Sequence, residues 1–448
     1  MAYPKTEEIA AREVRRLVER TPASGALYER AVKHLPLGVA SSFQANDPYP
    51  IYVRRGAGSR VWDVDENEYV DYHNGFGTMV VGHAHPKVVE AIERAARSGT
   101  HFAATGESAV ALAEELCRRF RLEKVRFSNS GTEATMDAIR VARAATGRDV
   151  IVKIEGSYHS HHDAVMFSVM PSADWLGPRE RPSSSPFTRG IPGGMADYTL
   201  VVPFNDAPAL DALLTEREGE VAALIMEPLM MNIGIIPPEP GYLEAVREIT
   251  ARHGVVLIFD EVKCGATIAA GGATERFGVR PDLACFAKAI GGGTPMAAFG
   301  GKAAVMDEIE RSAHLGTFNG NPLSMAAGLA ALTEVLTPDA YEHLAKLGTL
   351  LAEGCQRAID ETGMQAHAVD FGAKGCVTYS STPLKRYRDF LQTDSALFEA
   401  SWPYLVNRGV FMTPGDEEQW TISVRHDEDD IARYVDAFGE FCQEVVSS

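Results

Sequence analysis

Residues 221–261 read VAALIMEPLMMNIGIIPPEPGYLEAVREITARHGVVLIFDE, and this stretch contains the pattern that decides the fold. The apolar run VAALIM is followed by the amphipathic stretch YLEAVREITARHG and then by a second apolar run, VVLIF. Short apolar runs that alternate with amphipathic helices are typical of βα units, in which helices cover both faces of a parallel sheet. The alternation continues through KVRF, SGTEATMDAIRVARAA and DVIVKIEG. We therefore predict an α/β fold with a large, mostly parallel-sheet domain over residues 75–321.

Both ends of the chain differ from this central part. Residues 1–74 begin with a helical stretch and continue with alternating apolar and polar residues, which predict a small antiparallel meander from Pro48 to Tyr72. Residues 322–448 open with the helical run LSMAAGLAALTEVL and return to mixed strands and helices. We interpret 322–448 as a smaller α+β domain that residues 1–74 complete. The Pro-, Ser- and Gly-rich loop 171–194 has a length typical of a functional lid or a mobile segment.

The composition of the chain argues against several classes of protein. With 43 Lys+Arg and 61 Asp+Glu the net charge is −18, whereas a nucleic-acid-binding surface needs a surplus of positive charge. No uninterrupted apolar stretch approaches the roughly 20 residues that span a membrane, and the N-terminus lacks the apolar core of a signal peptide. The six scattered cysteines contain no C-x-x-C pair and fit reduced thiols. We expect a cytoplasmic protein that binds neither nucleic acid nor membrane.

Polar residues follow three of the apolar runs. Ser130, Gly131 and Thr132 open a helix after KVRF, where uncovered backbone N–H groups and the helix dipole favour an anion. Asp260 ends VVLIFD, and Lys288 follows LACFA and precedes a GGG run. Taken singly, these residues could be an ordinary helix cap, a solvated acid and a surface lysine. Because ligands bind outside the carboxyl ends of parallel strands, together they predict an anion cradle, an acid and an amine around one crevice.

The glycine runs do not fit a nucleotide-binding loop. Gly301 and Lys302 could end a phosphate-binding G-x-x-x-x-G-K-[ST] motif, but position 296 is Met and position 303 is Ala. No G-x-G-x-x-G opens a helix after the first strand. An anion cradle, an acid and a lysine are instead what pyridoxal phosphate requires, because this cofactor carries a phosphate, a pyridine nitrogen and an aldehyde. The residues therefore predict pyridoxal 5'-phosphate as the cofactor.

Six strings of the chain, in order, resemble the class III aminotransferases of fold type I, and most closely the glutamate-1-semialdehyde aminomutases and their relatives. They are SNSGTEATMDAIR, EGSYHSHHD, MEP…NIGIIPP, IFDEV, AKAIGGGTPMAAFGG and GTFNGNPL, and the likeness runs from about Leu27 to the C-terminus. The resemblance implies that Lys288 forms a Schiff base with the cofactor and shuttles a proton. It implies that Asp260 keeps the pyridine nitrogen protonated.

The remaining cofactor contacts also come from this resemblance. It implies that Ser130, Gly131 and Thr132 hold the phosphate. Tyr158 matches an aromatic residue that stacks on the cofactor ring, Asn232 an asparagine beside the ring hydroxyl, and Val262 a residue under the ring. Thr317 matches a threonine that reaches the phosphate of the neighbouring subunit, which implies a homodimer with shared active sites.

One loop could be interpreted as a metal site, because it contains His159, His161, His162 and Asp163. Histidines bunched on one loop are more often part of a polar surface, and a metal would not help the chemistry of pyridoxal phosphate. We therefore predict a polar surface there and no metal.

The chain departs from the aminomutases where their substrate binds. Gln44 stands at the position of the arginine that holds the substrate carboxylate, and loss of such a contact costs about 1.5–3 kcal/mol. Lys263 could replace that cation or face solvent, and Glu418 falls where the aminomutases have a pocket glutamate. These three residues are our candidates for the substrate pocket.

We therefore predict a transaminase with a ping-pong mechanism, in which Lys288 holds the cofactor and the amino group passes from an amine or amino acid to a keto or aldehyde acceptor. The alternative is a glutamate-1-semialdehyde 2,1-aminomutase. A decarboxylase or racemase of the same fold, or a scaffold descended from such an enzyme, is also compatible with the motifs. Retention of Lys288, Asp260 and the cradle argues against a scaffold, because binding alone needs no proton shuttle.

Overall fold

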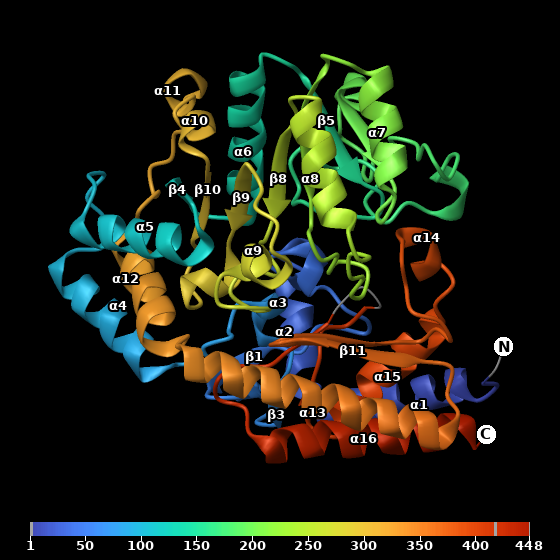
Figure 1. Cartoon of the computed structure of the whole chain (residues 1–448). Coiled ribbons are helices and arrows are strands. Elements are labelled where there is room, and N and C mark those ends of the chain that lie inside the picture. The colour runs from blue at the N-terminus through green and yellow to red at the C-terminus, as the bar shows by residue number, and fades with distance from the viewer. Residues whose placement is uncertain (1–2, 416–418, 448) are drawn as a thin grey trace.

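The computed structural model describes residues 3–415 and 419–447, and its central element is a seven-stranded sheet (Figure 1). The strand order is β4-β10-β9-β8-β7-β5-β6. The strands are β4 (Lys124–Ser128), β5 (Val150–Ile154), β6 (Thr199–Val202), β7 (Val221–Met226), β8 (Val256–Asp260), β9 (Leu283–Phe286) and β10 (Ala297–Gly301). Strands β9, β8, β7, β5 and β6 are parallel, which confirms the predicted α/β fold with a mostly parallel sheet.

Strand β10 is the exception, because it pairs antiparallel with both β4 and β9. Strand β4, which contains KVRF, therefore pairs only with an antiparallel neighbour among the described strands. The alternation of apolar runs and helices in the sequence did not predict this antiparallel pairing. Gly301 explains part of this arrangement. A Cβ atom at Gly301 would lie 2.0 Å from the backbone oxygen of Asp282, so only glycine allows β10 to approach the start of β9 this closely.

The parallel strands are buried on both faces, as their continuous apolar runs predict. Ile225 and Ile258 point toward one face and pack with α6 (Gly131–Thr146), whereas Leu224 and Leu257 belong to the core on the opposite face. Helices α10 (Ala303–Met306) and α11 (Ile309–Ser312) lie on the α6 side, and α5 (Glu107–Phe120), α7 (Ala207–Glu216), α8 (Tyr242–Arg252) and α9 (Gly272–Phe277) contribute to the other. Helices thus cover both faces of the sheet and bury its apolar side chains.

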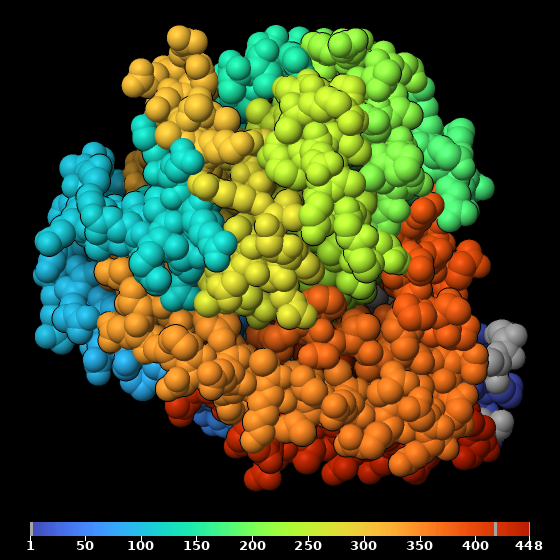
Figure 2. Space-filling model, in the orientation of Figure 1, coloured from blue at the N-terminus to red at the C-terminus, as the bar shows by residue number. Residues whose placement is uncertain are grey.

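The two ends of the chain pack together beside this sheet, in the lower part of Figure 1. Helix α1 (Thr6–Arg20) lies along α15 (Ser395–Asn407), and α13 (Pro338–Thr362) lies along α16 (Glu428–Val446). Figure 2 shows the orange and red C-terminal segment below the green and yellow central segment. The remaining helices are α2 (Pro22–Ala31), α3 (Asn74–Gly77), α4 (Pro86–Ser98), α12 (Pro322–Ala330) and α14 (Tyr387–Phe390).

Two small sheets accompany these helices. The first contains the antiparallel meander expected near the N-terminus, β1 (Val53–Ala57), β2 (Arg60–Asp63) and β3 (Glu68–Asp71), and β13 (Val410–Phe411) joins β3 in parallel. The second has the order β11-β12-β14, with β11 (His367–Phe371), β12 (Lys374–Thr378) and β14 (Trp420–Thr421). Because β13 pairs with β3, both chain ends share one sheet. The division into 1–74, 75–321 and 322–448 stays a prediction.

The first part of loop 171–194 is held by contacts with α14. The Tyr387 hydroxyl donates a hydrogen bond to the Pro171 carbonyl at 2.7 Å. The Arg388 guanidinium pairs with Glu155 at 2.9 Å and also donates to the Leu176 carbonyl. These contacts join the loop to α14 and to the end of β5. Within the described part of the chain, no helix combines the length and apolar character needed to cross a membrane.

Candidate active site

The carboxyl ends of four neighbouring parallel strands, β5, β7, β8 and β9, surround one small cavity, which we call the ring pocket. Each strand supplies side chains from its last residue or from the loop that follows. The lining residues are Tyr158 and Ser160 after β5, Glu227 and Asn232 after β7, Asp260, Val262 and Lys263 at the end of β8, and Lys288 after β9. The tertiary structure therefore brings together residues that lie up to 130 positions apart, counting from 158 to 288.

Asp260 is held in a fixed orientation inside this pocket. His159 Nδ1 donates a hydrogen bond to Asp260 Oδ2 at 2.8 Å, and the Val262 N–H donates to Oδ1 at 3.0 Å. Only 4% of Asp260 and 0% of His159 are exposed, so the hydrogen bond is strengthened by the absence of competing water. A buried acid with two donors offers a single, directed negative charge to a ligand in the pocket.

The prediction of a polar surface over 159–163 is wrong for His159, which is fully buried. His162 is partly buried, and the loss of water around it lowers its pKa to about 3. His161 and Asp163 are exposed. The role of His159 was missed because its partner, Asp260, lies 101 residues further along the chain. His159 follows the apolar strand β5 in the sequence, and this position could have predicted that it lies at the carboxyl edge of the sheet, near Asp260.

Lys288 is the first residue of a short 3-10 helix (Lys288–Gly291) that follows β9, and its backbone conformation is strained. Its φ is 51°, a left-handed value that non-glycine residues rarely adopt. Such strain persists only where the surrounding structure enforces it, and it is concentrated at functional sites. The next turn depends on Gly293, where a Cβ atom would lie 2.8 Å from Met79 Sδ. The loop therefore fixes the point from which the Lys288 side chain enters the ring pocket.

The start of α6 forms the edge of the same site. Ser130 is its N-cap, and the Ser130 hydroxyl accepts a hydrogen bond from the Glu133 N–H at 3.3 Å. A Cβ atom at Gly131 would lie 3.2 Å from both methyl carbons of Val262, so glycine lets the helix start approach the ring pocket closely. The Thr132 hydroxyl lies 3.1 Å from His161 Nδ1. A 16-residue helix that begins here directs its dipole and its unpaired N–H groups toward the pocket.

Glu227 is a site residue that the sequence did not single out, although the quoted MEP string contains it. Its carboxyl group accepts hydrogen bonds from the Tyr158 N–H at 3.3 Å and the Met231 N–H at 2.8 Å. Burial raises the pKa of Glu227 above its ordinary value, and burial also raises the pKa of Tyr158 to about 12. Glu227 thus ties the loops after β5 and β7 together, and Tyr158 keeps its phenolic proton.

The three candidates for the substrate pocket lie in different surroundings. Lys263 is only 7% exposed, and its Nζ donates to the Met231 carbonyl at 3.0 Å, so the alternative that it faces solvent is wrong. Gln44 is exposed in a short 3-10 turn, where its Oε1 accepts a hydrogen bond from the Ser41 N–H at 3.2 Å. Glu418 lies outside the described residues. Lys263 therefore belongs to the ring pocket, and Gln44 lies at a separate cavity beside it.

That separate cavity, which we call the aromatic pocket, has a volume of about 630 Å³. It is lined mainly by apolar residues of the N-terminal segment together with Trp402 and Phe411. The Phe43 ring lies edge-on against the Tyr158 ring, with their centroids 5.5 Å apart. Because Phe43 lines the aromatic pocket and Tyr158 lines the ring pocket, these two rings mark where the pockets adjoin.

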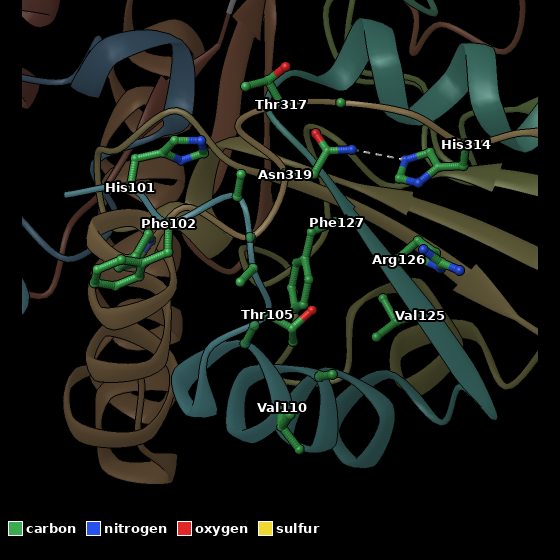
Figure 3. Close-up of a pocket in the computed structure, with 17 residues that line it drawn as sticks. His101, Phe102, Thr105, Val110, Val125, Arg126, Phe127, His314, Thr317 and Asn319 are labelled. Carbon is green, nitrogen blue, oxygen red and sulfur yellow. Dashed lines mark hydrogen bonds between the residues drawn. The ribbon is translucent and has the colours of Figure 1, made fainter. Parts of the chain in front are cut away.

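Thr317 lies elsewhere, on the rim of a third cavity of about 650 Å³ (Figure 3). Figure 3 places it near His101 and Asn319, and the Asn319 amide lies 3.4 Å from His314 Nε2. Thr317 is exposed and is not among the described residues that line the ring pocket. Its predicted contact with the phosphate of a neighbouring subunit stays a prediction.

The groups around the ring pocket fit pyridoxal phosphate. The α6 start offers N–H donors for a phosphate, and Gly131 leaves room beside them. Asp260 presents an oriented carboxyl group for a ring nitrogen, Lys288 presents an amine for an aldehyde, and Tyr158 presents an aromatic face. Asp260, Lys288 and Tyr158 line one cavity, and Gly131 at the start of α6 lies next to Val262 of that cavity.

Comparisons with known proteins agree with this fit. The family model described as aminotransferase class-III matches residues 42–371. Glutamate-1-semialdehyde 2,1-aminomutase from Sorangium cellulosum is 40% identical over 437 residues, which cover 96% of this chain and 97% of the relative. An omega-transaminase from Sphaerobacter thermophilus has a TM-score of 0.90 and 36% identity, and the match covers 96% of this chain and 100% of that chain. A glutamate-1-semialdehyde aminomutase from Pseudomonas aeruginosa in complex with PMP has a TM-score of 0.90 and 29% identity, with 99% and 100% covered.

Proposed function

Because the chain belongs to the class III aminotransferases, which are pyridoxal-phosphate enzymes of fold type I, we propose that it is a transaminase. In the proposed reaction the amino group of an amine or amino acid is transferred to a keto or aldehyde acceptor in two half reactions, and pyridoxal phosphate would supply the carbonyl chemistry for both. The observation that carries this proposal is the convergence of Lys288 and the His159-oriented Asp260 at the carboxyl ends of neighbouring strands.

When bound, pyridoxal phosphate supplies an aldehyde that reacts with amines and a ring that accepts electrons from the substrate carbon. We propose that Lys288 holds the aldehyde carbon in the resting enzyme and moves a proton to and from the substrate carbon. Asp260 would hold a proton at the ring nitrogen, and His159 would keep the Asp260 carboxyl group aimed at it. The low-dielectric surroundings make this fixed negative charge more effective than it would be in water.

The other residues of the site would position the cofactor. Ser130, Gly131 and Thr132 at the α6 start would bind the phosphate. Tyr158 would stack on one face of the ring and Val262 would pack on the other, while Asn232 would contact the ring hydroxyl. These roles rest on the resemblance of the motifs and on the placement of all three ring residues at one cavity.

We also propose a homodimer in which Thr317 completes the phosphate site of the partner subunit. Its exposed position on the rim of the cavity in Figure 3 supports this role, because a residue that serves a neighbouring chain must be accessible to it. Sedimentation of the holoenzyme should give a mass of twice 48.5 kDa. Thr317→Ala should weaken cofactor binding, measured by equilibrium titration, and a monomer that retains cofactor would contradict the proposal.

A second candidate function is glutamate-1-semialdehyde 2,1-aminomutase. The names of the similar relatives from Brevibacillus brevis and Sorangium cellulosum support it, and they do so more directly than they support transamination. The residue at position 44 supports the opposite choice. Gln44 cannot supply the bidentate charged contact that an arginine makes with a carboxylate, and its amide oxygen already caps its own 3-10 turn.

Two incubations of the holoenzyme separate the candidates. A transaminase converts its cofactor from the aldehyde form to the amine form when an amino donor is added alone, and a carbonyl acceptor restores the visible absorbance. An aminomutase converts glutamate-1-semialdehyde to 5-aminolevulinate with no second substrate. Failure of a broad panel of donors to change the cofactor absorbance would refute transamination, and absence of 5-aminolevulinate would remove the second candidate.

A further inference from the structure

Ser160 lines the ring pocket and has an unusual backbone conformation. Its φ is 83°, in the left-handed region that residues other than glycine rarely adopt. Such a conformation is unfavourable, and it persists only where the surrounding structure enforces it, often at a functional site. Glycine would adopt this conformation without strain, so the presence of serine favours a role for its hydroxyl group.

The segment around Ser160 contacts the first turns of α6 on both of its sides. On one side, Thr135 Oγ1 lies 3.0 Å from the carbonyl oxygen of His159. On the other side, the Thr132 hydroxyl lies 3.1 Å from His161 Nδ1. These contacts hold Ser160 beside the helix and explain how its left-handed conformation is maintained.

The Ser160 hydroxyl lies next to the N-terminus of α6. A Cβ atom at Gly131, the first residue of this helix, would lie 3.6 Å from Ser160 Oγ. The same Cβ atom would lie 3.2 Å from the methyl carbons of Val262, another lining residue of the ring pocket. The hydroxyl is therefore located where the edge of the ring pocket meets the helix start.

Within the part of the chain that the structure describes, the Ser160 hydroxyl has no hydrogen-bond partner, although only 8% of the residue is exposed. A buried hydroxyl without a partner is unfavourable, and most such groups in proteins are hydrogen-bonded. Ser168 is the other serine with a positive φ among the described residues, and it is 1% exposed. Its hydroxyl donates to the Ser183 carbonyl and accepts from the Ser185 N–H at 3.1 Å. Unlike Ser168, Ser160 thus has a hydroxyl that is available to a ligand.

The position of this hydroxyl suits an anion. The start of a helix favours negative charge, and a serine hydroxyl can donate one hydrogen bond to an anionic oxygen. A hydrogen bond to a charged acceptor is stronger than one to a neutral acceptor. Such a bond would offset the backbone strain at Ser160 when the anion is bound.

We propose that the Ser160 hydroxyl donates a hydrogen bond to the cofactor phosphate and is a further phosphate-binding group at the α6 start. This inference rests on the proposed function, in which pyridoxal phosphate binds with its phosphate at this helix. Ser160 should therefore contribute to cofactor affinity and not to the stability of the cofactor-free protein.

The first test measures binding of pyridoxamine 5'-phosphate, which has no aldehyde to react with Lys288. The cofactor-free full-length protein is titrated with this compound, and pyridoxamine, which lacks the phosphate, is measured as its competitor. S160A should raise the Kd for pyridoxamine 5'-phosphate about tenfold or more, as expected for loss of a hydrogen bond to a charged group. The competition constant of pyridoxamine should change less than twofold. An unchanged Kd for the phosphate compound, or an equal loss for both compounds, would overturn the proposal.

S160G separates the hydroxyl from the strained backbone. Because glycine adopts a left-handed conformation without strain, S160G should lose as much affinity as S160A without lowering the melting temperature of the cofactor-free protein. If S160G bound pyridoxamine 5'-phosphate as tightly as the native protein, the hydroxyl would not be a phosphate ligand. A melting temperature lowered by several degrees together with the lost affinity would indicate a structural role instead.

The matched control is S168A, at the buried serine of similar backbone conformation. It removes a hydroxyl that has two internal partners, so it should lower the melting temperature and leave the Kd for pyridoxamine 5'-phosphate within twofold of the native value. An equal loss of affinity in S168A and S160A would contradict a specific phosphate contact.

These binding measurements do not depend on turnover, so they can fail separately from the proposed function. If amino donors change the cofactor absorbance of the holoenzyme while S160A binds normally, transamination stands and the role of Ser160 is refuted. If the native protein does not bind pyridoxamine 5'-phosphate, the proposed function is refuted together with this inference.

Discussion

The ring pocket and the aromatic pocket adjoin at Tyr158 and Phe43, yet they are built from different parts of the fold. The ring pocket is formed by the carboxyl ends of four parallel strands, and within it the buried His159 is hydrogen-bonded to Asp260. The aromatic pocket is made largely by the N-terminal segment, with Trp402 and Phe411 from near the other end of the chain.

This difference separates two tasks, because the ring pocket holds the reacting groups and the aromatic pocket holds Gln44, a candidate contact for the substrate. A buried charge needs exact hydrogen-bond geometry, which strands packed on both faces can hold. An apolar surface selects a ligand by size and shape, so its residues can be replaced by other apolar residues without loss of the fold. Loops generally tolerate such substitutions. We therefore expect changes in the ring pocket to remove turnover with every substrate. Changes in the aromatic pocket should alter which substrate is used.

The largest effect should come from removal of the amine in the ring pocket. K288A should lose turnover by at least about 10²–10⁴-fold, the usual contribution of a positioned proton-transfer group. The measurement is the steady-state rate with a reactive donor, together with the cofactor absorbance and the melting temperature. The control is K346A, at an exposed lysine that pairs with Glu428. Near-normal turnover in K288A would mean that another amine serves the cofactor.

A change of charge without a change of shape should have the next largest effect. D260N can still accept the His159 hydrogen bond, but a neutral amide cannot hold a proton at the ring nitrogen. We expect turnover to fall by about 10²–10³-fold, as for loss of one fixed electrostatic group.

The matched control for D260N is the variant D282N. Asp282 is a buried acid that pairs with Arg247, and it lies just before the start of β9, away from the ring pocket. D282N should lower the melting temperature and leave turnover largely unchanged. If D260N and D282N lost activity equally, loss of any buried charge would explain the effect, and Asp260 would have no special role in the ring pocket.

A smaller loss should follow from removal of the group that orients Asp260. H159F should lower kcat by about 10–100-fold, the typical effect of losing a partner that positions a reacting group. The KM of the donor should change little, because His159 does not line either pocket. H159N retains an N–H donor close to the position of Nδ1 and should recover part of the rate. An equal loss in both variants would point to a purely structural role.

The smallest effect concerns stability rather than turnover. Glu261, next to Asp260, accepts a hydrogen bond from the Ala273 N–H at 2.7 Å, and burial raises its pKa from 4.5 to about 8. The folded state therefore holds a proton that the unfolded state releases above pH 4.5. Stability from this group is complete below pH 4.5 and is lost progressively as the pH rises to about 8.

E261Q keeps a neutral group of the same shape, so it should remove this part of the pH dependence. Between pH 5 and 8, the melting temperature of the native protein should fall by about 2–4 °C more than that of E261Q. The control is E216Q, at an exposed acid whose pKa the Arg181 side chain lowers. A pH slope in E261Q equal to that of the native protein would contradict the assignment.

Several features of the fold were predictable because local patterns carry them. The continuous apolar runs predicted parallel strands buried on both faces, and the alternation near the N-terminus predicted the β1–β3 meander. The antiparallel β10 was not predictable, since nothing in its apolar residues specifies the direction in which it pairs. Its place depends on Gly301 approaching the backbone of Asp282, a contact between segments.

The candidate site shows the same division. The sequence alone placed Lys288, Asp260 and Ser130 at strand or helix ends, because the residue that follows an apolar run is visible in the sequence. It also revealed that Gln44 replaces a charged residue of the resembling family. Only the tertiary structure decided that His159 is the partner of Asp260, that Lys263 is buried, and that the Phe43 ring packs against Tyr158. Hydrogen bonds and cavities depend on which distant segments meet, and that is set by the packing of the whole chain.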